Sequence, residues 1–256
     1  MVKNRVKEKI KQGEKVLGCF LNIYSPALVE LMGYAGFDFI VIDNEHGGFS
    51  DSELENLIRA AECVDIVPII RIAYDPSSIQ KALDRGARGI QVPMVNTKED
   101  AERIVKLAKY PPFGTRGAAF SIRPAKYGRI SGEQFLDHED ENTMIIVHIE
   151  TPEAARNFEE IIQVPGIDVA FIGPTDLSVN MGYKKEGSKH PDVQKTIQEI
   201  YDQAKKMNFP VGTIAPIQKD INRAIEQGNS YVVGVGSSIF LSTFDNYVGE
   251  WEKHKI

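Results

Sequence analysis

Eight short apolar segments recur along the chain, and most are separated by a stretch long enough for a helix. Each segment is rich in β-branched or aromatic residues and is bounded by turn residues, a pattern typical of parallel strands that are covered on both faces. Eight strands alternating with helices are the number that closes a TIM-type (β/α)8 barrel, which is the predicted fold, of the α/β class. The segments are VLGCFLN (16–22), FDFIVID (37–43), VPIIRI (67–72), GIQVPM (89–94), MIIVHIE (144–150), VAFIGP (169–174), PVGTIA (210–215) and YVVGVG (231–236).

Helix signals occupy the stretches between these segments. Ser or Thr followed by acidic residues, as at a capped helix N-terminus, opens SDSELENLIRAAE (50–62), TKEDAERIVKLAK (97–109) and TPEAARNFEEII (151–162). The charged N-terminus, MVKNRVKEKIKQGEK, predicts a further helix before the barrel. No linker or low-complexity segment divides the chain, and barrels of about 250 residues fold as one unit. We therefore expect one barrel domain over residues 1–256.

Composition and charge limit the partners of the protein. The 256 residues are 42% hydrophobic and carry a net charge of -6, with a pI near 5.5. This balance predicts no attraction to nucleic acid or to an anionic membrane. No apolar stretch approaches the ~20 residues that span a bilayer, and the N-terminus does not resemble a signal peptide, so we expect a cytoplasmic protein. We interpret Cys19 and Cys63, the only cysteines, as small core residues rather than as a disulfide or a metal pair.

One interval between strands is unusually long. It holds YPPFGTRGAAFSIRPAKYGRISGEQ (110–134), which is rich in Gly, Pro, Arg and aromatic residues. Long loops in compact domains usually have a function, because ordering them costs entropy. We expect this segment to form a lid or a subunit contact.

Titratable side chains gather where the predicted strands end, on the face where barrel enzymes build their active sites. Each has a structural explanation on its own, such as a helix N-cap or a surface salt bridge. Five on the same rim of the barrel favour an active site over five separate structural roles. They are Asp43, His46, Arg71, Glu150 and Asp176.

The types of these residues indicate a chemistry. Glu150 and Asp176 follow successive strands, and two carboxylates without a cysteine nearby suit Mg²⁺ or Mn²⁺. A carboxylate pair could instead cleave a glycoside, but that leaves Arg71 without a task. His46 with a carboxylate three residues away, Asp43, is a natural general base. None of the eight segments contains Lys, so chemistry through a Schiff base is not expected.

Four stretches carry a resemblance that covers nearly the whole chain. The sequence resembles the HpcH/HpaI family of metal-dependent pyruvate aldolases, related to 4-hydroxy-2-oxoheptanedioate aldolase and to 2-keto-3-deoxy sugar acid aldolases. The resemblance implies a barrel of the phosphoenolpyruvate/pyruvate type, a hexamer built as a trimer of dimers, and a role in the catabolism of compounds such as aromatics. The stretches are FDFIVIDNEHG (37–47), GIQVPMVNTKEDAERIVKLAKYPPFGTRG (89–117), IETPEAARNFEEI (149–161) and GIDVAFIGPTDLSVNMG (166–182).

The resemblance also implies roles for individual residues. Glu150 and Asp176 would hold a divalent cation (Mg²⁺, Mn²⁺ or Co²⁺), with no nucleotide cofactor. Arg71 would contact the ketone or enolate oxygen of the substrate. His46, paired with Asp43, would be the base.

Three further residues are implied in substrate binding. The backbone amides of Gly173 and Thr175 would receive the carboxylate of pyruvate, since Pro174 between them has no N–H. Asp84 would reach the active site of a neighbouring subunit.

His148 departs from the family pattern, in which Gln precedes Ile-Glu. Residues 148 and 150 fall on the same face of a strand, so the imidazole is expected inside the barrel, beside Glu150. There it would contact pyruvate as the amide does, add a nitrogen ligand to the metal, or be a hydrogen-bonded interior histidine. Substrate preference depends on which of these holds.

These inferences predict an aldehyde-lyase that reversibly cleaves a 4-hydroxy-2-oxo acid into pyruvate and an aldehyde. The metal and Arg71 would stabilise the enolate oxygen, while the Asp43/His46 pair removes the proton of the 4-hydroxyl. Two alternatives stay open: an acyl-CoA lyase of the citrate lyase β-subunit or malyl-CoA type, and a barrel that binds a 2-oxo acid without turning it over. The sequence does not identify the aldehyde.

Overall fold

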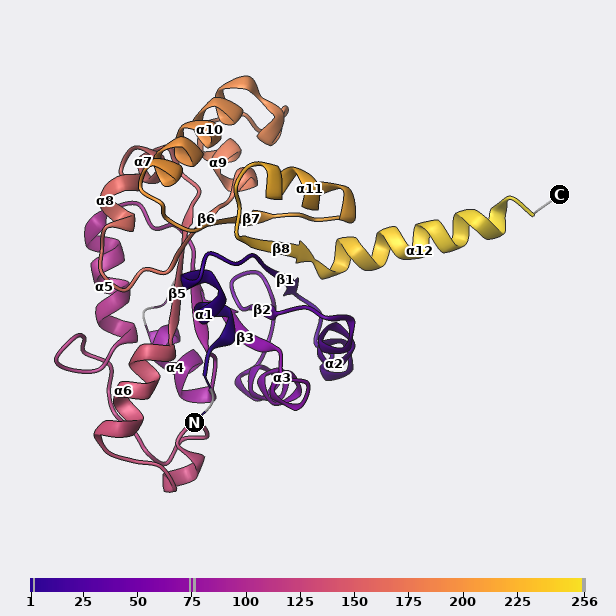
Figure 1. Ribbon diagram of the computed structural model, residues 1–256. Helices are drawn as coiled ribbons and strands as arrows, with labels where there is room; N and C mark the ends of the chain where they lie inside the picture. Colours follow the sequence, from indigo (N-terminus) through magenta and orange to yellow (C-terminus); the bar gives the residue numbers. More distant parts are fainter. Residues whose placement is uncertain (2, 74, 76, 255–256) are drawn as a thin grey trace.

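Eight parallel strands close into a barrel in sequence order, with β1 also paired to β8 (Figure 1). The computed structural model describes residues 1–256 except 2, 74, 76, 255 and 256. Every strand lies within one of the eight predicted segments, so the predicted barrel is confirmed. The strands are β1 Val16–Leu21, β2 Phe39–Asp43, β3 Val67–Arg71, β4 Gly89–Val92, β5 Met144–Ile149, β6 Val169–Ile172, β7 Val211–Ile214 and β8 Tyr231–Val235.

Helices follow the strands and cover most of the barrel's outer face (Figure 1). The capping boxes predicted at Ser50 and Thr97 are present, with Glu53 and Asp100 as partners. The helix predicted over residues 151–162 is divided at Asn157 into two short helices. The elements are α1 Arg5–Lys11, α2 Pro26–Ala35, α3 Asp51–Cys63, α4 Ser77–Arg85, α5 Lys98–Ala108, α6 Glu133–Asn142, α7 Pro152–Arg156, α8 Phe158–Ile162, α9 Pro174–Asn180, α10 Pro191–Lys206, α11 Gln218–Glu226 and α12 Gly236–Glu252, with 3-10 turns η1 Lys126–Gly128 and η2 Gly187–Lys189.

Alternation along the strands divides the core into two layers. One set of side chains fills the barrel interior, where α1 contributes Val6 and Ile10 to the packing. The other set packs between the strands and the surrounding helices and includes Cys19. Cys63 is exposed at the end of α3, so its predicted place in the core is wrong.

The long segment between α5 and α6 lies at the end of the barrel where the strands begin, because α5 runs back from the carboxyl end of β4. Its contacts agree with this placement: Arg123 pairs with Glu62 near the end of α3, and Arg116 pairs with Asp84 near the end of α4. A lid over this chain's own strand ends is therefore wrong. A subunit contact stays a prediction.

The last helix, α12, does not lie along the barrel but extends away from it (Figure 1). Large apolar side chains on α12 are exposed: Leu241, Phe244, Tyr247, Val248 and Trp251. Among the described residues, no helix is long and apolar enough to cross a membrane.

Candidate active site

The predicted active-site residues lie at or just beyond the carboxyl ends of four strands. In a parallel barrel the carboxyl ends of all strands meet on one face, and the titratable side chains follow these ends. Asp43 ends β2, His46 follows it in the next loop, Arg71 ends β3, Glu150 follows β5, and Asp176 lies in the first turn of α9 after β6.

Arg71 and Asp43 form a two-point ion pair between neighbouring strands. Arg71 Nε donates to Asp43 Oδ1 at 2.9 Å, and Nη2 donates to Oδ2 at 2.7 Å. The guanidinium carbon lies 4.6 Å from the ring centroid of Phe20. Burial would raise the pKa of Asp43, but the hydrogen bond and charge of Arg71 hold it below its ordinary value. Asp43 is therefore an ionised group that fixes the plane of the Arg71 fork.

His46 has a different partner from the one that its sequence spacing suggested. Asp43 Oδ1 accepts the backbone N–H of His46 at 3.2 Å, whereas the imidazole Nε2 lies 3.7 Å from Glu45 Oε2. Asp43 pairs with Arg71 because a bidentate, charge-assisted contact is stronger than one to an imidazole. The imidazole is 64% exposed, and Glu45 is the carboxylate beside it.

Sequence reasoning missed Glu45. Its side chain is 9% exposed, and Oε2 lies 3.3 Å from Arg71 Nη1 as well as near His46. Burial raises the pKa of Glu45 and the charge of Glu150 adds to the rise, while Arg71 and His46 oppose it. The sequence feature that could have identified Glu45 is its position, two residues beyond Asp43 in the turn that follows β2.

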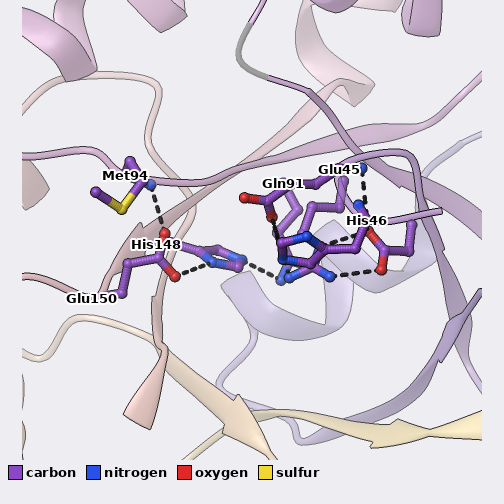
Figure 2. Close-up of polar contacts among 8 residues, drawn as sticks. Glu45, His46, Gln91, Met94, His148 and Glu150 are labelled. Atoms are coloured by element: carbon purple, nitrogen blue, oxygen red, sulfur yellow. Dashed lines mark hydrogen bonds and ion pairs between the residues drawn. The ribbon is translucent and has the colours of Figure 1, made fainter. Parts of the chain in front are cut away.

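Glu150 is a buried carboxylate with a hydrogen-bond partner on each oxygen (Figure 2). Oε1 accepts the backbone N–H of Met94 at 2.7 Å, and Oε2 lies 2.8 Å from His148 Nδ1. Burial would raise the pKa of Glu150, but the interactions with His148, the Met94 N–H and the charge of Arg71 together bring it below its ordinary value. Glu150 is therefore ionised at neutral pH.

Gly173 brings the Glu150 carboxylate against the start of α9. A Cβ atom at position 173 would lie 2.8 Å from Glu150 Oε2, closer than real Cβ contacts. The first turn of α9 also carries Asp176, whose side chain is exposed. Two carboxylates offer hard oxygen donors of the kind that Mg²⁺ and Mn²⁺ prefer. Within the described part of the chain, no group of three or more His, Cys, Asp or Glu residues could hold a metal ion.

The two backbone amides predicted to bind a carboxylate are not equivalent. The N–H of Gly173 donates to the carbonyl of Ile149 at 3.2 Å, because the β5–β6 ladder continues one residue past β6. Within α9, Leu177 N–H bonds to the Gly173 carbonyl, and the N–H of Thr175 lies before that first helical bond. Thr175 therefore has the available amide, and Gly173 acts through its missing side chain.

Asp84 lies away from these residues. It occupies the last turn of α4, near the end of the barrel where the strands begin, and accepts a hydrogen bond from Arg116 Nη2 at 2.7 Å. The fold does not bring Asp84 to this chain's own strand ends.

The chain matches a known protein family over most of its length. The family described as HpcH/HpaI aldolase/citrate lyase matches residues 16–242. The chain belongs to this family. It is accordingly an enzyme of the aldolase and lyase type, which disfavours glycoside hydrolysis by the carboxylate pair.

Relatives of known activity and structure extend over the whole barrel. A 5-keto-4-deoxy-D-glucarate aldolase of Escherichia coli O157:H7 is 32% identical over 252 residues, covering 98% of this chain and 97% of the relative. A family member from Burkholderia cenocepacia J2315 has a TM-score of 0.91 at 27% identity, covering 97% and 99% of the two chains. The citrate synthase SbnG has a TM-score of 0.84 at 30% identity, covering 96% and 97%.

Replacing Gly173 with alanine tests the packing around Glu150. The added Cβ would displace the carboxylate, and a shift of about 1 Å in an active site can cost ~10²-fold in rate, so Gly173→Ala should lose about that much lyase activity. Circular dichroism should show an intact fold. Gly249→Ala is the control, since a Cβ there meets nothing within 4 Å. Wild-type turnover in Gly173→Ala would contradict the arrangement.

Proposed function

We propose that the protein is a divalent-metal-dependent aldolase that cleaves a 4-hydroxy-2-oxo acid into pyruvate and an aldehyde. The observation that carries the proposal is the Arg71 fork, fixed by Asp43 and close enough to the buried Glu150 to lower its pKa. Cleavage of the bond between C3 and C4 moves an electron pair onto the C2 oxygen. A preoriented guanidinium beside that oxygen is favourable because the negative charge grows as the bond breaks.

Glu150 and Asp176 are the proposed ligands of the metal. When bound, a divalent cation would supply Lewis-acid polarisation of the 2-oxo group. Thr175, on the same turn of α9 as Asp176, would direct its free N–H toward the carboxylate of the substrate. Arg71 and these groups would thus hold the 2-oxo acid by its carboxylate and its 2-oxo oxygen, which orients the neighbouring C3–C4 bond for cleavage.

His46 is the proposed base. In retro-aldol cleavage the proton of the 4-hydroxyl leaves as C4 becomes an aldehyde, and the enolate then takes a proton at C3 to give pyruvate. Because Nε2 of His46 faces Glu45, Nδ1 would receive the hydroxyl proton. The Glu45 carboxylate would stabilise the imidazolium that forms.

The relatives favour a sugar-derived diacid as the substrate. Retro-aldol cleavage of 5-keto-4-deoxy-D-glucarate, the compound in the relatives' name, balances as pyruvate plus 2-hydroxy-3-oxopropanoate. An acyl-CoA lyase is the second candidate, because the family includes citrate lyase and SbnG is a citrate synthase on the same barrel. A barrel that binds a 2-oxo acid without turnover is the third.

A pyruvate-release assay separates these candidates. We expect pyruvate from 5-keto-4-deoxy-D-glucarate, loss of activity after exhaustive EDTA treatment, and recovery with Mn²⁺, Co²⁺ or Mg²⁺. Condensation of pyruvate with succinic semialdehyde, glycolaldehyde, lactaldehyde and glyceraldehyde would define the range of aldehydes. Activity that survives chelation would refute the proposed requirement for a divalent metal. Cleavage of malyl-CoA without pyruvate release from any hydroxy-oxo acid would assign the chain to the acyl-CoA lyases.

Arg71→Ala should reduce kcat far more than it raises KM, because the guanidinium acts mainly on developing charge. Loss of one such donor costs about 10²- to 10³-fold in kcat. Arg71→Lys should recover little, since an ammonium lacks the planar fork. The same variants should fail to exchange the methyl protons of pyruvate with D₂O, followed by proton NMR with Mg²⁺ present. Arg59→Ala, at an exposed position on α3, is the control, and wild-type exchange in Arg71→Ala would remove Arg71 from the mechanism.

We also propose that the protein is a homo-oligomer, a hexamer arranged as a trimer of dimers. α12 follows β8 but leaves the barrel, so the outer face between α11 and α2 lacks the helix that covers the other strands (Figure 1). On α2, one of the two helices that flank this gap, Leu31 and Tyr34 are exposed. The apolar face of α12 is suited to the same gap on a second copy, and assembly would give Asp84 a route to a neighbouring active site.

A charged face on α12 should prevent this assembly. Phe244, Val248 and Trp251 lie on one face at helical spacing, and burial of such side chains stabilises an interface by about 1.5–3 kcal/mol each. Light scattering after size-exclusion chromatography should find an oligomer for the wild type and a smaller species for the double variant Phe244→Glu, Trp251→Glu. Asn246→Glu, on the opposite face, should assemble normally. A monomeric wild type would contradict the proposal.

A further inference from the structure

A chain of four buried polar side chains crosses the interior of the barrel and ends at Glu150. Tyr231 Oη lies 3.1 Å from Gln91 Oε1, Gln91 Nε2 lies 2.7 Å from His148 Nε2, and His148 Nδ1 lies 2.8 Å from Glu150 Oε2. The four residues come from β8, β4 and the end of β5. All are at most 4% exposed. Figure 2 shows the last two links, with His148 between Gln91 and Glu150.

The hydrogen bonds in this chain run in one direction. Tyr231 begins it as a donor: burial raises the pKa of its phenol, so the hydroxyl keeps its proton. Gln91 Oε1 accepts a hydrogen bond from this hydroxyl, so the amide Nε2 faces His148 as a donor. A ring nitrogen that accepts carries no hydrogen, so the ring hydrogen of His148 is on Nδ1. Nδ1–H then donates to Glu150.

The opposite direction would leave a donor unused. If His148 Nε2 carried a hydrogen, Gln91 would have to turn its carbonyl toward the ring and its NH₂ group toward Tyr231. The Tyr231 hydroxyl would then accept from Gln91, and its own hydrogen would have no acceptor among the described residues. A buried donor without a partner is unfavourable, which selects the first arrangement.

Both nitrogens of His148 are therefore occupied inside the protein. Nε2 accepts a hydrogen bond from Gln91, Nδ1–H donates one to Glu150, and the Phe171 ring stacks on the imidazole with centroids 4.8 Å apart. This disfavours two of the alternatives drawn from the sequence, contact with pyruvate and ligation of a metal through nitrogen. The third, a hydrogen-bonded interior histidine, fits all these contacts.

We propose that His148 is a positioning residue that orients the Glu150 carboxylate, and that Tyr231 and Gln91 impose its tautomer from within the barrel. The role of this carboxylate, which is to hold the cation, rests on the proposed function. His148 on Oε2 and Met94 N–H on Oε1 fix the carboxylate plane, and one lone pair on each oxygen stays available. Without His148, the Met94 N–H alone would hold the carboxylate, which could then turn about its last bond, and such loss of orientation weakens a metal site.

The first test is made on the metal-free protein. Long-range ¹H–¹⁵N spectra of protein labelled in histidine, at pH 7, report which ring nitrogen carries the hydrogen, and His148→Phe identifies the signal. We expect hydrogen on Nδ1 in the wild type and a mixture of tautomers in Tyr231→Phe. The control is Tyr110→Phe, which removes a hydroxyl that is also buried but has no hydrogen-bond partner in the described part of the chain. Hydrogen on Nε2 in the wild type, or identical spectra for Tyr231→Phe and the wild type, would overturn the proposal.

The second test measures Mn²⁺ affinity by electron paramagnetic resonance. His148→Phe should weaken binding about 10- to 100-fold, the usual effect of losing a group that orients a ligand. Tyr231→Phe should weaken it about 5-fold, the worth of one hydrogen bond, and should add nothing in the His148→Phe background. Tyr110→Phe should bind as the wild type does.

The outcomes separate this proposal from the proposed function. A wild type that binds no Mn²⁺ and releases no pyruvate would refute the function, and the tautomer spectra would still test the direction of the chain. Unchanged Mn²⁺ affinity in His148→Phe together with a higher Kd for pyruvate would make His148 a substrate contact and overturn the positioning role. Additive effects of the two substitutions would show that Tyr231 does not act through His148.

Discussion

The arrangement at the barrel mouth depends on keeping Glu150 charged although it is buried. A carboxylate out of water is costly unless donors replace the lost solvent. Here one donor is the N–H of Met94, just after β4, and the other is His148 of β5, the strand that Glu150 follows. Met94 supplies its N–H from a backbone with φ of 55°, a conformation that a residue with a side chain seldom adopts. Gly173 leaves the space that the carboxylate occupies. Several local features of the chain thus serve a single anionic group.

The strand ends could be predicted because they follow from local patterns. Continuous apolar runs bounded by turn residues placed all eight strands, and the parallel barrel then put Asp43, Arg71 and Glu150 on one face. Partners were harder to predict. Asp43 and His46 are close in sequence, yet Arg71 takes the Asp43 carboxylate because the two are register partners on adjacent strands. Spacing along the chain does not reveal that register.

The remaining differences have the same origin in tertiary context. The segment over residues 110–134 has the composition of a functional loop, but its place after α5 rather than after a strand puts it at the other end of the barrel. The exposure of Cys63 depends on how the last turn of α3 packs, which periodicity does not determine. The sequence predicted a role for the N–H of Gly173, whereas the contact of this residue with Glu150 depends on its lack of a Cβ atom.

The charges around Glu150 also favour the proposed metal. Asp43, Glu45 and Glu150 face one cation, Arg71, and the pKa of Glu45 is raised by burial and then by the charge of Glu150. Arg71 neutralises one of these carboxylates through its two-point bond, so the mouth of the barrel keeps an excess of negative charge. An anionic 2-oxo acid would be repelled by that excess. A divalent cation held by Glu150 and Asp176 would offset this negative charge. The residues that hold the cation would therefore also favour binding of the anionic substrate.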